Sequence, residues 1–459
     1  MNKPCRFDFP PSFDLACPGG EPPKDEATAL MMRILHALSH KNRALASPEY
    51  DESLEFLGKI IPLTVHKIPS GAEVWSWVAP KRWTVREAWV KKGERVICDF
   101  KDHPLRLAAY STPFSGKLSL AKLRQHLHFD ADRPDAIPFA YKYYKPDWAF
   151  CLPYNSYKTL TPGAYTVRID ADLTDDFVKV GESVLKGTSE DSVILAAHLD
   201  HPGQANDGLS GVAAGVALMK RLSKLKARRL TYRLVLCPEN IGSLCYLFKN
   251  RELISLFKHG VFLEALGNKN HLKLQRSKNG ARQIDRLAEH ALAKTVPVYG
   301  TGAFRKVVCN DEINFDGPGI DIPTVSLTRW PYPEYHTSDD NPSIISPRCM
   351  KESLDVLWEL IGLLERNVYP KRKYKGNLFL SRYGLYEDLN ADDTVERISL
   401  AFEGDLSVLD IAEKLGIPFD RAYEYARKFK EAGLVEFLDS PGQEAAEGSQ
   451  TVQRRKAHA

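Results

Sequence analysis

The chain has 459 residues and a formal net charge of only +4, so its charge gives no reason to expect binding to nucleic acid or to an anionic membrane. This length favours two or three domains, and contents of 43% hydrophobic and 27% charged residues are typical of a globular protein. The eight cysteines are scattered without a CxxC pair, which favours reduced thiols over a disulfide framework. No stretch has the pattern of a signal peptide or a membrane span, and we therefore expect a cytoplasmic protein.

The N-terminal part of the chain predicts two helices followed by short strands. An irregular arm is expected over residues 1–24, and apolar residues recur at helical spacing over 26–40. A second helix is expected over 47–61, with Ser47 as its cap. From about 60 to 190, β-rich pieces such as EVWSWV, RVICDF, RLAAYS and YTVRIDADL alternate with turn residues, as in a β sandwich or barrel.

Strands and helices alternate between residues 190 and 370. SVILAAHLD and LTYRLVLCPE have the pattern of buried strands, and the helix-like run LSGVAAGVALMKRL lies between them. This order predicts a largely parallel sheet flanked by helices. Active sites of such sheets lie at the carboxyl ends of the strands.

The C-terminal part predicts a third structural region. The basic link KRKYK at 371–375 marks its boundary, and three short helices and a strand are expected after it. The turn at 416–418 gives this region a helix-turn-helix pattern. The polar tail at 439–459 is predicted to be disordered.

The most informative stretch is AAHLDHPGQANDGLSG at 196–211, directly after an apolar strand. It places His198, Asp200, His201 and Asp207 within ten residues. Imidazole and carboxylate groups are the ligands that zinc uses at hydrolytic sites. In the alternative interpretation, Asp207 and Ser210 merely cap the following helix, and this stretch alone does not decide between the two.

Further acidic and imidazole groups follow the next strands. Glu239 comes after LVLC, Glu264 ends GVFLEAL, and His336 lies in the loop WPYPEYHTSDDNP. Because these groups are expected at successive strand ends of one sheet, a metal centre is the better interpretation.

These residues resemble the zinc aminopeptidases of peptidase family M-twenty-eight. The resemblance rests on His198-Leu199-Asp200, on Asn206-Asp207 before Ser210-Gly211, and on NDEINFDGPGIDIPTVSL followed by His336. It is closer to a bacterial subgroup with an inserted protease-associated-like domain and a C-terminal winged helix, and it spans roughly residues 26–437. It implies an α/β catalytic domain (25–75 and 186–375), a β-rich insert (76–185) and a winged helix (376–438).

The resemblance also implies roles for individual residues. Glu239 matches the general base, and Asp200 matches the residue that supports a ligand. The matched metal ligands are His198, Asp207, Glu264 and His336. Zn²⁺ is the implied cofactor, as one or two ions.

Three positions depart from the family pattern. The family has two adjacent glutamates, whereas Asn240 follows Glu239 here, so the second metal site is expected to be weak or absent. His201 is a feature of the subgroup, and either replaces His198 as a ligand or contacts substrate. Asp311 and Glu312 are candidates to meet a substrate ammonium group.

The sequence therefore predicts a zinc-dependent hydrolase of the aminopeptidase type, acting on a peptide or a small amide. The alternatives are a non-catalytic metal- or ligand-binding protein on the same fold, and a winged-helix regulator that binds DNA. The segment at 419–433 carries nearly balanced charge, which is a poor footprint for phosphate. A role of this domain in homo-oligomer formation is the more favoured prediction.

Overall fold

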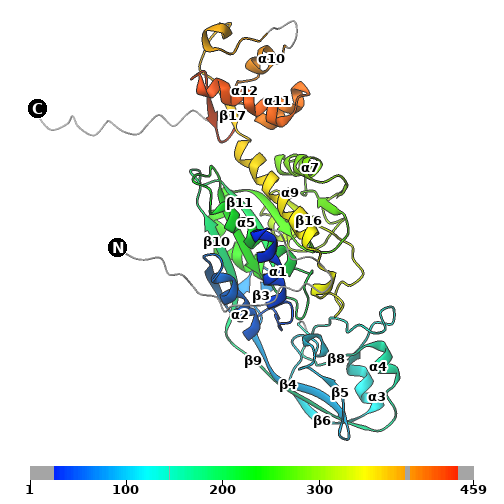
Figure 1. The fold of residues 1–459 in the computed structure, drawn as a ribbon. Helices are drawn as coiled ribbons and strands as arrows, with labels where there is room; N and C mark the ends of the chain where they lie inside the picture. The colour runs from blue at the N-terminus through cyan, green and yellow to red at the C-terminus, as the bar shows by residue number, and fades with distance from the viewer. Residues whose placement is uncertain (1–24, 144, 388–392, 443–459) are drawn as a thin grey trace, which may run out of the picture. The chain divides into compact units, whose positions relative to one another are not determined.

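The computed structural model describes residues 25–143, 145–387 and 393–442 (Figure 1). The predicted arm at 1–24 and the predicted tail from residue 443 onward lie outside the described residues. The chain forms two compact units, which divide between Trp358 and Glu359.

The first unit is built on an eight-stranded sheet. Its four central strands, in the order β12-β11-β13-β16, run parallel, and β14 and β15 form a further parallel pair. This arrangement confirms the predicted mostly parallel sheet flanked by helices. In spatial order the strands are β1 (Thr64–Pro69), β10 (Phe177–Leu185), β12 (Thr231–Cys237), β11 (Ser192–His198), β13 (Phe257–Leu263), β16 (Thr324–Thr328), β14 (Leu272–Gln275) and β15 (Tyr299–Gly302).

Strand β11 lies at the centre of this unit, and all seven of its residues are buried. A continuous apolar strand is expected where helices cover both faces of a parallel sheet. Helix α5 (Leu209–Leu222) packs on β11 and is covered in turn by α1 (Glu26–Leu38). The close approach of α5 to the sheet requires a glycine, because a Cβ at Gly211 would come within 2.0 Å of the Leu263 carbonyl oxygen. This unit also contains α2 (Pro48–Gly58), α6 (Ile241–Lys249), α7 (Gln283–Thr295), the short α8 (Glu312–Phe315) and the start of α9 (Pro347–Arg366).

A smaller antiparallel sheet lies at the lower end of the ribbon in Figure 1. Its strands, in spatial order, are β5 (Arg95–Asp99), β4 (Arg82–Lys92), β9 (Ala164–Thr174) and β6 (Phe114–Ser119). The fully buried Trp83 belongs to its core. The same region contains the two-residue strands β7 (Leu127–His128) and β8 (Phe150–Cys151) and the short helices α3 (Leu120–Leu123) and α4 (Tyr154–Lys158).

Three stretches in this part differ from the expected short strands. Strand β10, which the sequence analysis placed in the β-rich stretch, pairs with β1 and β12 of the large sheet and not with the small sheet. EVWSWV forms the two-residue strands β2 (Glu73–Val74) and β3 (Trp77–Val78), with Trp75 between them at φ 51°. RLAAYS makes only the isolated bridges of Leu107 and Ala109.

In its described residues, the second unit contains the end of α9, three further α-helices and a two-stranded antiparallel sheet. The helices are α10 (Thr394–Leu400), α11 (Val408–Leu415) and α12 (Phe419–Glu431), and β17 (Tyr369–Arg372) pairs with β18 (Val435–Leu438). Gly416 ends α11 in the left-handed conformation, where the turn is predicted. The rings of Phe402 and Phe429 meet 5.2 Å apart in the core. The assignment of this unit as a winged helix stays a prediction.

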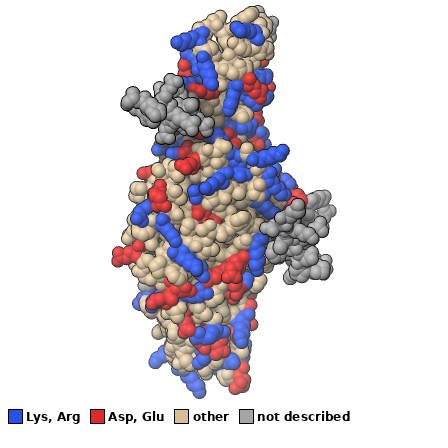
Figure 2. Space-filling model, turned by 90° about the vertical axis from the view of Figure 1, so that its left-hand side faces the viewer, with Lys and Arg blue, Asp and Glu red and all other residues tan. Residues whose placement is uncertain are grey.

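Basic and acidic side chains are interspersed on the face that Figure 2 shows. This mixture is what a chain with 63 basic and 59 acidic residues is expected to display. Within the described ranges, no helix combines the length and the apolar character needed to span a membrane.

Candidate metal centre

The predicted site residues meet at the carboxyl ends of the parallel strands. His198 is the last residue of β11, and Cys237, its partner at the end of β12, precedes Glu239 by two positions. Glu264 directly follows β13, and the loop after β16 carries His336. The parallel register therefore assembles groups that are up to 138 residues apart in sequence.

Asp207 lies at the centre of this cluster, with its two carboxylate oxygens facing different histidines. Its Oδ1 is 3.4 Å from His198 Nε2. Its Oδ2 is 3.1 Å from His336 Nε2 and 3.8 Å from His201 Nε2. The metal-binding atoms of His201, Asp207 and His336 all lie within 4.8 Å of one another, and so do those of His198, Asp200 and His201. Glu264 belongs to neither group, although its Oε2 lies 3.6 Å from His198 Nε2.

Two buried atoms of this cluster lack hydrogen bonds. Asp207 Oδ2 and His336 Nε2 have no hydrogen-bond partner in the described part of the chain, although they face each other. Buried polar atoms are normally paired, and an unpaired one calls for an explanation. A cation between the imidazole nitrogens and the carboxylate would satisfy both atoms, so the residues fit a metal ion.

Electrostatics favour the protonation states that bind metals. Burial lowers the pKa of His201 to about 4, which keeps the imidazole neutral. Burial alone would raise the pKa of Asp207, but the neighbouring His201 and His336 hold it below its usual range. Metal ligands must be neutral imidazoles and ionised carboxylates, and His201 and Asp207 meet these conditions. His198 differs from them: burial alone would lower its pKa, but hydrogen bonds to Asp200 and Glu264 raise it well above its usual range.

Glu239 is one of the accessible groups of the cluster. Its side chain is 29% exposed, and its Oε2 lies 3.5 Å from His201 Nε2. Its backbone N–H donates to Asp200 Oδ1 at 2.8 Å, which fixes the start of the loop. Partial burial and the neighbouring carboxylates raise the pKa of Glu239 well above its usual range. A carboxylate with a raised pKa at an open position is suited to exchanging protons.

The remaining predicted positions lie around this centre. The Asn240 side chain donates to Glu239 Oε1 at 3.3 Å and belongs to neither metal-binding group. Asp311 is buried and accepts from Asn240 N and from the Ser243 hydroxyl, while its Oδ2 has no partner among the described residues. Glu312 is also buried, and its Oε1 lies 3.2 Å from Arg305 Nη1.

The helix-capping alternative for Asp207 is wrong. The N-cap of α5 is Gly208, and no side chain makes the cap hydrogen bond. Gly208 has φ 69°, and a Cβ there would lie 2.5 Å from His198 Nδ1. The Ser210 hydroxyl donates to the Asn206 carbonyl and accepts from Leu266 N, which ties this loop to the loop after β13.

Two buried charged residues that the sequence analysis did not single out hold the site loops. The Arg43 guanidinium donates to the carbonyls of Leu199, His201 and Gln204 at 2.8–2.9 Å. Asp340 accepts from three successive backbone N–H groups, those of residues 205–207. No local pattern marks Arg43, whereas Asp340 could have been found from its position four residues after His336.

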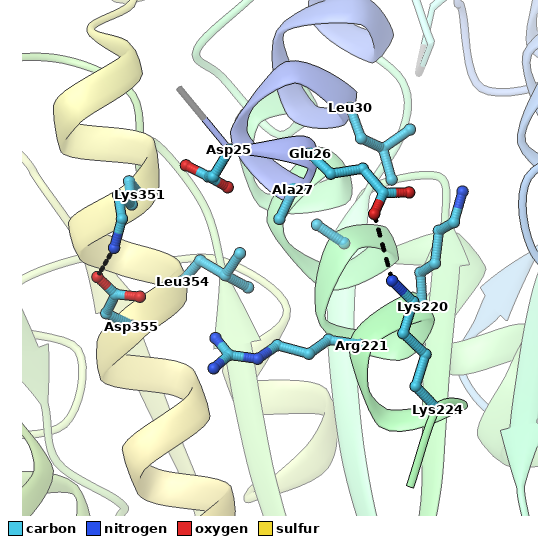
Figure 3. A pocket seen from close by; sticks show the side chains of 11 residues that line it. Asp25, Glu26, Ala27, Leu30, Lys220, Arg221, Lys224, Lys351, Leu354 and Asp355 are labelled. Atoms are coloured by element: carbon cyan, nitrogen blue, oxygen red, sulfur yellow. Dashed lines mark hydrogen bonds and ion pairs between the residues drawn. The ribbon is translucent and has the colours of Figure 1, made fainter. Parts of the chain in front are cut away.

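A separate cavity of about 450 Å³ lies between α1, α5 and α9 (Figure 3). Two ion pairs lie in its lining, Glu26–Lys224 and Lys351–Asp355. It contains none of the candidate site residues.

Comparisons with known proteins agree with this fold. The profile of a family described as a domain of unknown function, DUF4910, matches residues 32–367. A Clostridium acetobutylicum protein, provisionally named for polysaccharide biosynthesis and an aminopeptidase-like domain, is 32% identical over 391 residues, which cover 83% of this chain and 89% of that protein.

Two solved structures extend the comparison. A provisionally named peptidase from Clostridium acetobutylicum is 29% identical with a TM-score of 0.82, covering 90% of this chain and 97% of that one. A zinc aminopeptidase from Bacillus subtilis is 12% identical with a TM-score of 0.56, covering 73% and 94%, and so shows a similar fold.

The fold and the side-chain cluster define an aminopeptidase-like α/β protein with a candidate metal site. The family match covers more than half of the chain. The chain therefore belongs to the DUF4910 family.

Proposed function

We propose that the protein is a zinc-dependent hydrolase of the aminopeptidase type, which cleaves an amide bond in a peptide or a small amide. The observation that carries this proposal is the arrangement around Asp207, whose two oxygens face the imidazoles of His198, His201 and His336. Glu239, beside them, is positioned to act on a water molecule. The aminopeptidase-like fold of the solved relatives supports the same reaction class.

His201, Asp207 and His336 are the proposed ligands of the more tightly held ion. His201 would then supply the ligand that Asn240 cannot supply, because amide groups are poor zinc ligands. His198 and Glu264 lie on the other side, near Asp207 Oδ1, and would hold a second, weaker ion. Asp200 accepts from the Glu239 backbone and lies 3.6 Å from His198 Nδ1, so it is the proposed support of that imidazole.

The protein's own groups would then carry out the proton transfers. Bound zinc supplies a Lewis acid, which polarises the scissile carbonyl and lowers the pKa of a nearby water molecule. Glu239 accepts the proton of the attacking water and delivers it to the leaving amine. Asp311 Oδ2, a buried acceptor without a partner among the described residues, is the proposed contact for a substrate ammonium group. Glu312 is less suited to this contact because it already forms an ion pair with Arg305.

The other parts of the chain have supporting roles in this proposal. The β-rich insert at 76–185 and the aromatic loop at 330–333 limit access to the site. The predicted winged helix at 376–438 serves homo-oligomer formation, and the protein acts in the cytoplasm without binding membranes or nucleic acid.

A second candidate function is metal or ligand binding without catalysis. It is favoured by Asn240, which stands where the zinc aminopeptidases that the sequence resembles have an acidic ligand. Here Asn240 contacts Glu239 and Asn314. The two candidates differ in turnover and can be separated by direct measurement.

The test combines metal analysis of the purified protein with a screen of aminoacyl and amide substrates. Glu239→Gln is expected to keep the zinc and the fold, because the amide is nearly isosteric. Its activity should fall by a factor on the order of 10² to 10⁴, the usual contribution of a positioned general base. Glu252→Gln, which alters an exposed glutamate, is the control and should behave as wild type.

Two results would contradict the proposal. Bound zinc without turnover of any amide would favour the binding protein. Loss of zinc from Glu239→Gln would make Glu239 a ligand and would require another base.

A further inference from the structure

One segment of the insert, residues 133–139, runs along the loop that carries His336. Pro138 and Thr337 form an antiparallel bridge, Phe139 N donates to the His336 carbonyl at 2.7 Å, and Ser338 N donates to the Ile137 carbonyl at 2.9 Å. The segment at 133–139 therefore adds a short piece of β pairing to a loop that has no regular secondary structure of its own.

Arg133 joins the two ends of this loop. Its guanidinium donates to the Pro333 carbonyl at 2.8 Å and forms an ion pair with Asp339. In sequence, His336 lies midway between Pro333 and Asp339. A planar guanidinium can make both bonds at once, whereas an ammonium group cannot reproduce this geometry.

Aromatic rings then fix the imidazole itself. Tyr335 stacks on His336 with the ring centroids 3.7 Å apart. Phe139 meets His336 edge-on at 5.1 Å and also contacts His201 at 5.2 Å. Phe139 thus contacts His201 and His336, two of the three histidines whose imidazoles face the Asp207 carboxylate. The His336 backbone has φ 56°, a conformation that persists only where its surroundings hold it.

We propose that Arg133 and Phe139 are positioning residues, through which the inserted sheet region holds His336 in place for metal binding. This inference rests on the proposed zinc site. His336 Nε2 must stay beside Asp207 Oδ2, yet the His336 side chain is 32% exposed and is less enclosed than the other two histidines. The side of the loop that leads into α9 is anchored to the Asp207 loop through Asp340. The contacts of residues 133–139 provide the second anchor.

The inference is tested by the rate at which zinc leaves the full-length protein for a chromophoric chelator. Loss of a residue that orients a ligand lowers metal affinity by a factor of about 10 to 100. We expect Arg133→Met and Phe139→Ala to release zinc about tenfold faster than wild type, at the lower end of that range. Arg133→Lys should fall between wild type and Arg133→Met, because it keeps the charge and loses the two-point contact.

Arg168→Met is the matched control. Arg168 belongs to the same insert and also forms an ion pair, with Glu87 at 2.9 Å, but that pair lies on the small sheet. Its zinc release should equal that of wild type. The visible absorption bands of cobalt-substituted protein give a second readout, because they report ligand geometry, and they should shift in Arg133→Met and remain unchanged in Arg168→Met.

Unchanged zinc release and cobalt bands in Arg133→Met and Phe139→Ala would overturn the inference. Equal acceleration in Arg168→Met would also overturn it, since general loosening of the insert would then be the cause. If Arg133→Met does not fold, Phe139→Leu is measured instead and has the same two outcomes. A wild-type protein that binds neither metal would refute this inference together with the zinc site, whereas normal binding in all variants would refute this inference alone.

Discussion

Replacing Arg43 by methionine tests whether this buried cation organises the metal-binding loop. Arg43 is fully buried, and its guanidinium donates to four backbone carbonyls, those of Leu38, Leu199, His201 and Gln204. Burial lowers the pKa of Arg43 to about 10, so the side chain remains charged at neutral pH. Methionine fills a similar volume but offers no donor, which leaves the four acceptors without their partner.

The expected loss of stability follows from these contacts. A net contribution of about 1 to 1.5 kcal/mol for each of the four hydrogen bonds gives a loss of about 4 to 6 kcal/mol. This loss is comparable with the whole stability of many domains, which is about 5 to 15 kcal/mol. Three of the four carbonyls belong to the segment at 199–204, so zinc affinity should fall as well.

Urea unfolding of the metal-free protein measures the first effect, and competition with a chelator measures the second. Arg86→Met is the control, because its side chain is 51% exposed and pairs with Asp170 and Asp172 on the surface. That variant should unfold at nearly the same urea concentration as wild type, because solvent screens exposed ion pairs. A loss of less than about 1 kcal/mol in Arg43→Met would refute the assigned role of Arg43.

Other predictions concern the ligands, a buried carboxyl group and the C-terminal unit. His336→Ala, Asp207→Ala and His201→Ala should each lose the tightly held zinc and the activity together, as measured by metal content after dialysis; retention of one zinc per chain in His201→Ala would move the ligand role to His198. Burial raises the pKa of Glu312 from 4.5 in the unfolded chain to about 7 in the folded protein. The contribution of this group to the free energy of unfolding is therefore fully present below pH 4.5, and about 3 kcal/mol of it is lost as the pH rises through 7. Glu312→Gln should flatten that dependence in urea unfolding at pH 5 and pH 8, and an unchanged slope would contradict the assignment. Deleting 376–459 removes β18, the partner strand of β17, and should alter stability or the assembly state measured by light scattering. Neither the intact chain nor the deletion variant should bind DNA. Salt-sensitive, sequence-selective DNA binding by the intact chain that the deletion abolishes would contradict this prediction.

Much of the α/β unit could be predicted because its elements have strong local patterns. The run at 209–222 forms α5 with the expected bounds, and the apolar run from Ser192 forms β11. The β-rich region was harder to predict, because alternation indicates a strand but not its sheet. The pattern therefore did not show that β10 joins the large sheet, or that RLAAYS makes only isolated bridges.

The candidate site was predictable to the extent that its residues end strands. His198, Glu239 and Glu264 follow buried runs, and the parallel register brings them together. The contacts that hold the site were not predictable. Arg43 is one of 63 basic residues, and three of its acceptors lie 156 to 161 positions away in sequence. Phe139 likewise reaches His336 from a different sheet region, and no spacing rule connects them.

The left-handed backbone at the site also bears on how such a protein would change over evolutionary time. Four non-glycine residues in its loops have positive φ values: His201 at 78°, Asn240 at 58°, Ala265 at 49° and His336 at 56°. Glycine adopts this conformation without steric cost, whereas other residues are strained there by about 1 to 3 kcal/mol. If the cluster had no function, a change to glycine at each position would remove this strain and stabilise the fold. Histidine stands at two of them, so part of this backbone strain lies at residues whose imidazoles face Asp207.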